Sequence, residues 1–87
     1  MSVYMVERNL KGISMPDLAA AQTAAKVTAA AMREHGTAIR YIRSTFAPED
    51  GRCLCLFEAA DETVVRRLND TAGLPYYRVV PAFDLMP

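Results

Sequence analysis

The sequence lacks an excess of charge of either sign and lacks any long apolar run. Ten lysine and arginine residues balance ten aspartate and glutamate residues over 87 positions, so the formal net charge is zero. Without a basic field or a span of membrane length, we expect neither nucleic acid nor a membrane as a partner. The first residues, MSVYMVERN, have no signal-peptide regions. The predicted location is therefore the cytoplasm.

Residues that hold metals or act as nucleophiles are equally scarce. The only histidine, His35, precedes Gly36 in what reads as the last turn of a helix, where a cation interacts well with exposed carbonyls. The only cysteines, Cys53 and Cys55, are two residues apart and are interpreted as reduced thiols packed in a core. No phosphate-binding glycine loop, nucleophile elbow or histidine pair occurs. We predict no metal and no cofactor.

The segment RCLCLFEAADE, residues 52–62, is the most informative part of the chain. Its nearly continuous apolar run is typical of a strand inside a sheet with both faces covered, and Glu58 is the first charge after it. Asp61 follows as the cap of a helix whose apolar stripe is Val64, Val65, Leu68 and Ala72, with Asn69 mostly facing water. Gly73-Leu74-Pro75 ends that helix.

The remaining segments supply three strands and one helix. Residues 3–9 predict a first strand, and Ser14 caps a helix over residues 15–35 whose inward stripe is rich in alanine. Residues 38–46 predict a second strand, and residues 48–51 a hairpin turn into the strand that starts at Arg52. A last strand over residues 77–85 contains Pro81, which favours an edge position.

The resulting order, β-α-β-β-α-β, predicts one α+β domain over residues 1–87 with the ferredoxin-like fold. This fold has a four-stranded antiparallel sheet of order 4-1-3-2 and two helices on one face. The other face would then be an exposed apolar patch. We therefore expect a homodimer that pairs through the helix-free sheet face in a barrel-like arrangement.

Strand directions predict a cluster of polar residues at one end of the sheet. Guanidinium groups offer forked donors to carboxylates, so the cluster suits an anionic or polar aromatic small molecule, although sheet-end ion pairs would explain the same residues. The predicted ligand-binding residues are Arg8, Arg43, Ser44, Arg78, Tyr76 and Tyr77.

Two other classes of function fit the same sequence. In a cofactor-independent enzyme of the isomerase, cyclase or monooxygenase type, Glu7 or Glu58 would transfer protons together with Tyr41. In a structural or regulatory interaction module, the same residues would only pack and pair. A small-molecule binder is the leading hypothesis of the three.

Three segments together resemble a family of small bacterial proteins of unknown function with a ferredoxin-like fold. They are YMVERNLKGIS at residues 4–14, CLCLFEAADETVV at residues 53–65 and AGLP at residues 72–75. The resemblance implies a dimer packed through its sheets. The best-known branch of the family is described as nickel-binding, with histidines near the end of the first strand and in the second helix. Here those regions contain Glu7, Arg8 and residues 68–72, so we predict a relative without a nickel site.

Overall fold

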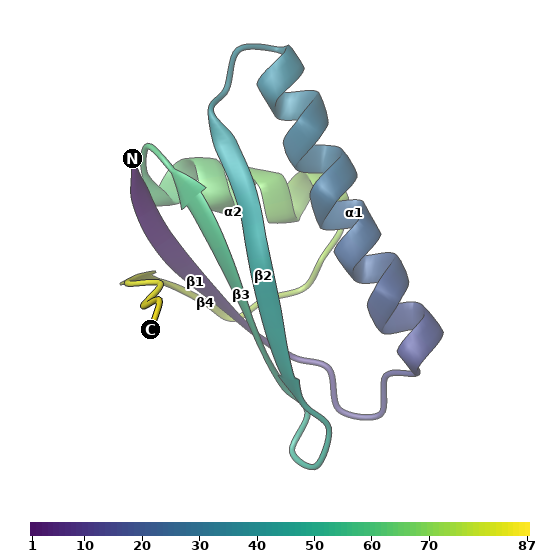
Figure 1. Ribbon diagram of the computed structural model, residues 1–87. Helices are drawn as coiled ribbons and strands as arrows, with labels where there is room; N and C mark the ends of the chain where they lie inside the picture. Colours follow the sequence, from purple (N-terminus) through teal and green to yellow (C-terminus); the bar gives the residue numbers. More distant parts are fainter.

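The computed structural model describes residues 1–87 and contains a sheet with helices on one face only (Figure 1). The strands are β1 (Ser2–Asn9), β2 (Ile39–Ala47), β3 (Arg52–Ala59) and β4 (Arg78–Ala82). The helices are α1 (Met15–Glu34) and α2 (Glu62–Ala72). No helix is long and apolar enough to cross a membrane. The elements follow one another in the predicted sequence.

The strand order is β2-β3-β1-β4, which is the predicted order read from the other edge. All neighbouring strands are antiparallel, and β3 is central, with Val3 of β1 opposite Glu58. Pro81 lies in the edge strand β4, where a missing backbone N–H is tolerated. The predicted ferredoxin-like fold is confirmed.

Helix α1 begins and ends as the sequence predicts. Ser14 Oγ accepts a hydrogen bond from the backbone N–H of Asp17, at 3.2 Å. At the other end, His35 Nδ1 lies 2.8 Å from the carbonyl oxygen of Ala31. The only fully buried residues of α1 are Ala25 and Ala29. Because alanine has a short side chain, α1 lies close to the sheet but buries little area of its own.

Helix α2 has the predicted caps, but Asn69 on this helix differs from the prediction. Asp61 Oδ1 accepts from the N–H of Val64, and Gly73 has a φ of 69°, the left-handed conformation that ends helices. Asn69, expected to face water, is completely buried. It is buried because its side chain is bonded within the protein: its Nδ2 donates to the carbonyl of Val65, and its Oδ1 accepts from Arg8.

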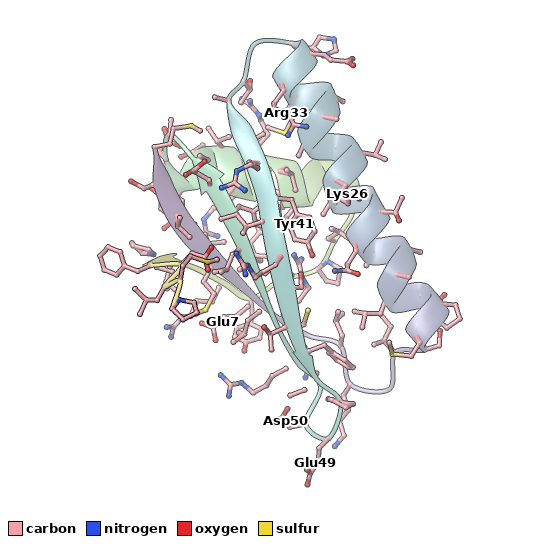
Figure 2. The ribbon with its side chains drawn as sticks, in the orientation of Figure 1. Glu7, Lys26, Arg33, Tyr41, Glu49 and Asp50 are labelled. Atoms are coloured by element: carbon pink, nitrogen blue, oxygen red, sulfur yellow. The ribbon has the colours of Figure 1, made fainter.

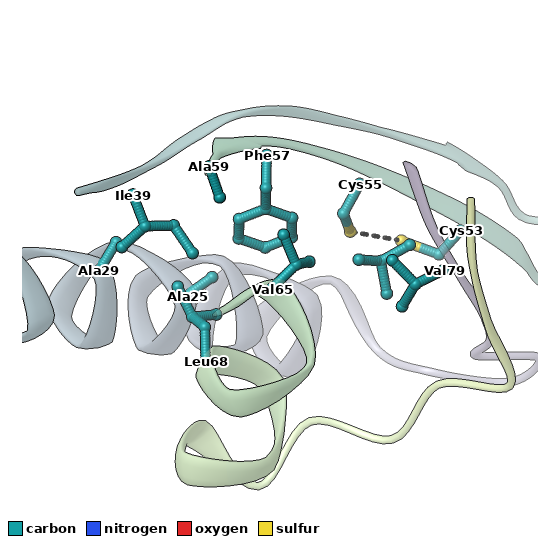
Figure 3. Packing of buried hydrophobic residues seen from close by; sticks show 11 residues of the cluster. Ala25, Ala29, Ile39, Cys53, Cys55, Phe57, Ala59, Val65, Leu68 and Val79 are labelled. Atoms are coloured by element: carbon teal, nitrogen blue, oxygen red, sulfur yellow. Dashed lines mark hydrogen bonds between the residues drawn. The ribbon is translucent and has the colours of Figure 1, made fainter. Parts of the chain in front are cut away.

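The core lies between the sheet and the two helices (Figure 3). Strand β3 contributes Cys53, Cys55, Phe57 and Ala59 to it, whereas Leu54 and Leu56 point to the other face and are half-buried. The expectation that both faces of this strand are covered is therefore not met within one chain, because both helices lie on the same face. The helix-free face keeps apolar side chains that one chain does not fully bury.

The C-terminal segment turns back across that face instead of extending the last strand to Leu85. Strand β4 ends at Ala82, and Asp84 Oδ2 then lies 2.9 Å from Nη2 of Arg43. Arg43 belongs to β2, at the opposite edge of the sheet from β4. A contact between the two edges requires the segment after Ala82 to cross the strands between them.

Candidate functional site

The three arginines expected to converge lie on opposite faces of the sheet. Arg8 is opposite Cys53 in the β1–β3 register and points toward the helices. Arg43 and Arg78 are opposite Leu56 and Glu7, whose side chains belong to the helix-free face. Side chains alternate along a strand, so Arg8 and its neighbour Glu7 cannot share a face. The predicted mouth with all three guanidinium groups does not form.

Arg8 is buried, with 4% of its surface exposed, and it contacts three different elements. Its Nη2 donates to Asn69 Oδ1 at 2.9 Å, its Nη1 to the carbonyl of Pro75 at 3.2 Å, and its Nε to Cys55 Sγ at 3.4 Å. Arg8 forms no ion pair with a carboxylate, since the four ion pairs of the chain involve other arginines. A buried charge without a carboxylate needs other compensation.

Neither of the two tyrosines predicted to flank the arginines hydrogen-bonds to Arg8, Arg43 or Arg78. Tyr76 donates from its hydroxyl to Asp70 Oδ1, at 3.0 Å, and its ring lies 5.8 Å from the guanidinium carbon of Arg66. Tyr77 is 61% exposed, and its backbone N–H donates to the carbonyl of Glu7. Tyr76 is therefore fixed against α2, and Tyr77 supplies only a backbone contact near the sheet.

Ser44 and Tyr41 belong to a polar cluster on the helix-covered face. Ser44 Oγ donates to Cys55 Sγ at 2.9 Å and shares a hydrogen bond with the Tyr41 hydroxyl. Gln22 Nε2, on the exposed side of α1, donates to the same Tyr41 oxygen at 3.1 Å. The Tyr41 ring packs on Phe57, with ring centroids 5.2 Å apart. A continuous chain of hydrogen bonds thus connects Cys55 with the surface.

The sulfur atoms of Cys53 and Cys55 lie 3.7 Å apart, and both residues are buried and free (Figure 3). The hydrogen bond from Cys53 lowers the pKa of Cys55 to about 6; burial opposes this, while the charge of Arg8 and the Ser44 hydroxyl add to it. The same contact and burial raise the pKa of Cys53. A cavity of about 20 Å³ adjoins Cys53, Cys55, Arg8, Ser44 and Tyr41.

The sequence patterns do not predict this cluster, although they contain part of the signal for it, which is the alternation of side chains along each strand. The sequence patterns predict Arg8 at the mouth of a pocket and the cysteines as reduced thiols in the core, whereas the structure places Arg8 beside Cys55. The alternation along each strand places Val6 and Arg8 on the face of Cys53 and Cys55 once the β1–β3 register is known. Predicting the cluster requires the β1–β3 register, which no single segment of the sequence specifies.

The helix-free face carries three ion pairs and a groove. Arg78 Nε lies 2.6 Å from Glu7 Oε2, Arg40 Nε 3.4 Å from Glu58 Oε1, and Arg43 pairs with Asp84. Glu7 is only 7% exposed, and its Oε2 accepts no hydrogen bond of good geometry despite the nearby guanidinium. A groove of about 640 Å³ lies between the sheet and the C-terminal segment; its lining includes Val3, Arg40, Ile42, Glu58, Phe83 and Leu85.

The residues of the enzyme hypothesis are not brought together. Tyr41 lies on β2 toward α1, whereas Glu7 lies on β1 (Figure 2) and its side chain belongs to the helix-free face. The register places Glu58 of β3 on that same helix-free face. The sheet separates the phenol from both carboxylates. No single substrate position reaches Tyr41 together with either of them in one chain.

The side chains that could act as metal ligands do not form a site that suits nickel. His35 is exposed at the end of α1 with its Nδ1 bonded to a carbonyl, and no three His, Cys, Asp or Glu side chains are grouped to hold a metal ion. Nickel favours nitrogen-rich sites, which one exposed imidazole does not supply.

The strand order, the helices on one face and the open opposite face define a small α+β protein of the ferredoxin-like class. The chain belongs to the family described as nickel responsive protein SCO4226-like, which it matches over residues 4–81. The resemblance found in the three sequence segments is thereby confirmed.

A solved relative has the same fold. The crystal structure of SCO4226 from Streptomyces coelicolor A3(2) superimposes with a TM-score of 0.77 at 20% sequence identity, over 93% of this chain and 95% of that chain. At this level of identity the likeness concerns the fold alone. No curated protein matches the sequence.

Proposed function

We propose that this chain is a small-molecule binding protein that works as a homodimer, with its ligand in the groove on the helix-free face. The groove of about 640 Å³ carries this proposal. Sites that bind small organic molecules are commonly 300–1,000 Å³ and combine apolar walls with a few polar groups. The groove has both, since Val3, Ile42 and Phe83 stand beside Arg40 and Glu58.

The state of the helix-free face supports pairing with a second copy. Met5, Leu54, Leu56 and Val80 are apolar and only half-buried there, and β1 places Met5 between Leu56 and Val80. A contiguous apolar patch of this kind is typical of an interaction surface, and a twofold dimer covers it with an identical patch. The side chain of Glu7 also lies on this face, where it is paired with Arg78 but its Oε2 accepts no hydrogen bond of good geometry, so an additional donor from a second copy would satisfy it.

The charges around the groove favour a ligand with a carboxylate. The side chain of Arg40 is 57% exposed, and its only acid contact, with Glu58, is 3.4 Å long. An exposed pair at this distance contributes little, about 0–1 kcal/mol, so Arg40 is free to turn toward an anion. The exposed Phe83 ring offers an apolar surface to the rest of the ligand. An aromatic or aliphatic organic acid satisfies both groups.

Nickel is not the proposed ligand, although the family is named for its response to nickel. Calorimetric titration with nickel should show no tight stoichiometric binding. His35→Ala should leave that result unchanged and lower helix stability by about 0.5 kcal/mol. Micromolar nickel affinity that this substitution abolishes would contradict the proposal.

Two measurements test the dimer and the ligand separately. Light scattering at micromolar concentration should give twice the single-chain mass, and Leu56→Asp should give a single-chain mass or an unfolded chain. Val27→Asp is the matched control, because Val27 is 62% exposed on α1 and its substitution should leave the dimer intact. A monomeric wild-type protein rules out the dimer.

The ligand is tested by thermal unfolding against a panel of aromatic and aliphatic carboxylic acids. Binding should raise the melting temperature and weaken with added salt. Arg40→Lys should reduce the shift because lysine lacks the planar fork, and Arg67→Lys on the exposed side of α2 is the control. A panel in which no acid stabilises the protein contradicts the proposed ligand class.

A further inference from the structure

Arg8 is a buried cation whose nearest candidate for a balancing negative charge is a sulfur atom. The guanidinium is 4% exposed, and its other partners, Asn69 and the carbonyl of Pro75, are neutral. Burying an uncompensated charge is costly, and proteins avoid it by pairing the charge. Cys55 Sγ, at 3.4 Å from Nε, is the one contact that becomes an anion by losing a proton.

We propose that Cys55 is a thiolate paired with Arg8 and that it reacts with small hydroperoxides, hydrogen peroxide first, to form a sulfenic acid. The site is separate from the groove of the helix-free face, because the sheet lies between them. It therefore does not depend on the proposed function, and neither result decides the other.

The hydrogen-bond pattern around Cys55 is that of an acceptor. The Arg8 Nε–H can only donate, the Ser44 hydroxyl at 2.9 Å donates, and the Cys53 thiol at 3.7 Å completes the set. Three donors directed at one sulfur stabilise its negative form. The lowered pKa of Cys55, about 6, agrees with this geometry.

No acidic group opposes that charge state. The titratable groups in contact with Cys55 are Arg8 from β1 and Cys53 from its own strand, while Tyr41 is one hydroxyl further away. Helix α1 contributes only Leu18, Ala21, Gln22 and Ala25 to the cavity, and the segment after α2 contributes Leu74. Thus no carboxylate faces the thiolate from the elements packed around it.

The space beside Cys55 restricts what can react. The cavity of about 20 Å³ holds roughly one water molecule. Gln22, Tyr41 and Ser44 line both this cavity and a surface groove between α1 and β2, so they separate the sulfur from solvent by one layer of side chains. A two-oxygen peroxide is small enough to enter when that layer moves, whereas a bulky electrophile is excluded.

The reaction balances with groups that are present. The thiolate attacks one peroxide oxygen, the S–O bond forms and the O–O bond breaks, and the leaving hydroxide takes a proton to become water. Sulfur is oxidised by two electrons and the peroxide is reduced by two. The proton comes from the Ser44 and Tyr41 hydroxyl groups. Solvent returns a proton to these hydroxyls at the exposed end of the hydrogen-bond chain, near Gln22.

The alternative occupant of two neighbouring thiols is a soft metal ion, and the surroundings disfavour it. Only two sulfur ligands are available, without a third His, Cys, Asp or Glu in reach. The guanidinium 3.4 Å from Cys55 also repels a cation. The same charge stabilises an anionic sulfur and does not repel a peroxide, which is neutral.

The test treats the reduced, folded protein with hydrogen peroxide, removes the peroxide with catalase and then unfolds the protein in urea that contains dimedone, which traps sulfenic acids. Mass spectrometry locates the adduct. One adduct per chain is expected, on Cys55, and Cys55→Ser should abolish it. The rate should rise with pH to a plateau with a midpoint near 6, the pKa of Cys55. Equal labelling of both cysteines, or a midpoint at or above that of the urea-unfolded chain, overturns the proposal.

Because Arg8 variants risk misfolding, the positioning of the thiolate is tested at Ser44. Ser44→Ala should slow adduct formation at pH 7 by about tenfold and move the midpoint upward, since one donor to the thiolate is lost. Thr45→Ala, the next residue and on the opposite face, should leave rate and midpoint unchanged. Tight stoichiometric binding of Cd²⁺ with a thiolate absorption band, lost in Cys55→Ser, would assign the site to a metal and overturn the proposal.

Discussion

The two faces of the sheet compensate their charges differently. On the helix-covered face Arg8 is buried against neutral groups and a sulfur atom, whereas on the helix-free face Arg40, Arg43 and Arg78 each pair with a carboxylate. The covered face is sealed by α1 and α2, while the other is crossed only by the C-terminal segment. The comparison shows that one sheet can hold a buried charge among neutral and sulfur groups on one face and exposed ion pairs on the other.

The largest expected effect distinguishes neighbouring residues of β3. Phe57 is completely buried under the helices, and Phe57→Ala should lower the free energy of unfolding by about 3–5 kcal/mol, whatever the protein concentration. Leu56 is half-buried on the other face, and Leu56→Ala should cost less than about 2 kcal/mol in dilute protein. Urea unfolding at two concentrations measures both, and equal losses in dilute protein would contradict the difference between the faces.

A pair of arginine substitutions gives the next largest difference. Arg8→Met removes the donors to Asn69 and Pro75 and leaves buried acceptors unpaired, which should cost about 3 kcal/mol. Arg40→Met breaks a pair on the open face whose arginine is 57% exposed, and it should cost less than about 1 kcal/mol. Thermal and urea unfolding compare the two. If Arg8→Met costs no more than Arg40→Met, the contacts of the buried guanidinium are not stabilising.

The pH dependence of stability tests the charge state on the covered face. The pKa of Cys55 is about 6 in the folded protein, below its usual value near 9, so the folded state binds fewer protons than the unfolded chain between those values. The free energy of unfolding should therefore rise with pH from about 6 to 9, by at most about 1.4 kcal/mol per pH unit, and this contribution is lost as the pH falls through 6. Cys55→Ser should remove that slope. An unchanged slope would show that another group causes it.

The smallest effect concerns the helix that closes the covered face. Ser14→Ala removes the hydrogen bond that caps α1 at the N–H of Asp17 and should lower the free energy of unfolding by about 1 kcal/mol. The cap matters for this helix because only two of its residues, both alanines, are fully buried. The exposed Ser2 provides the control, and Ser2→Ala should change stability by less than about 0.5 kcal/mol. Hydrogen exchange along α1 should accelerate in Ser14→Ala alone. Equal exchange in both variants would mean that packing, not the cap, holds the helix.

The sequence alone determined the elements and their order. Helix caps, turn residues and strand periodicity are local, so Ser14, Asp61, Gly73 and Pro81 predicted where segments begin, end or lie at an edge, and the order of segments then implied the sheet topology. The family resemblance also rested on contiguous segments. The boundaries that failed were in β4, where the chain leaves the sheet early to contact Arg43.

Only the tertiary structure decided which polar groups meet. A shift of one residue in strand pairing moves every side chain to the other face, so the positions of Arg8, Arg78 and Tyr41 depended on registers that no local pattern specifies. The helical pattern predicts Asn69 at the surface, whereas in the folded chain it is buried and accepts a hydrogen bond from Arg8. A buried polar side chain needs a hydrogen-bond partner. For Asn69 that partner is Arg8, which is 61 residues away in the sequence and comes into contact with it only in the folded chain.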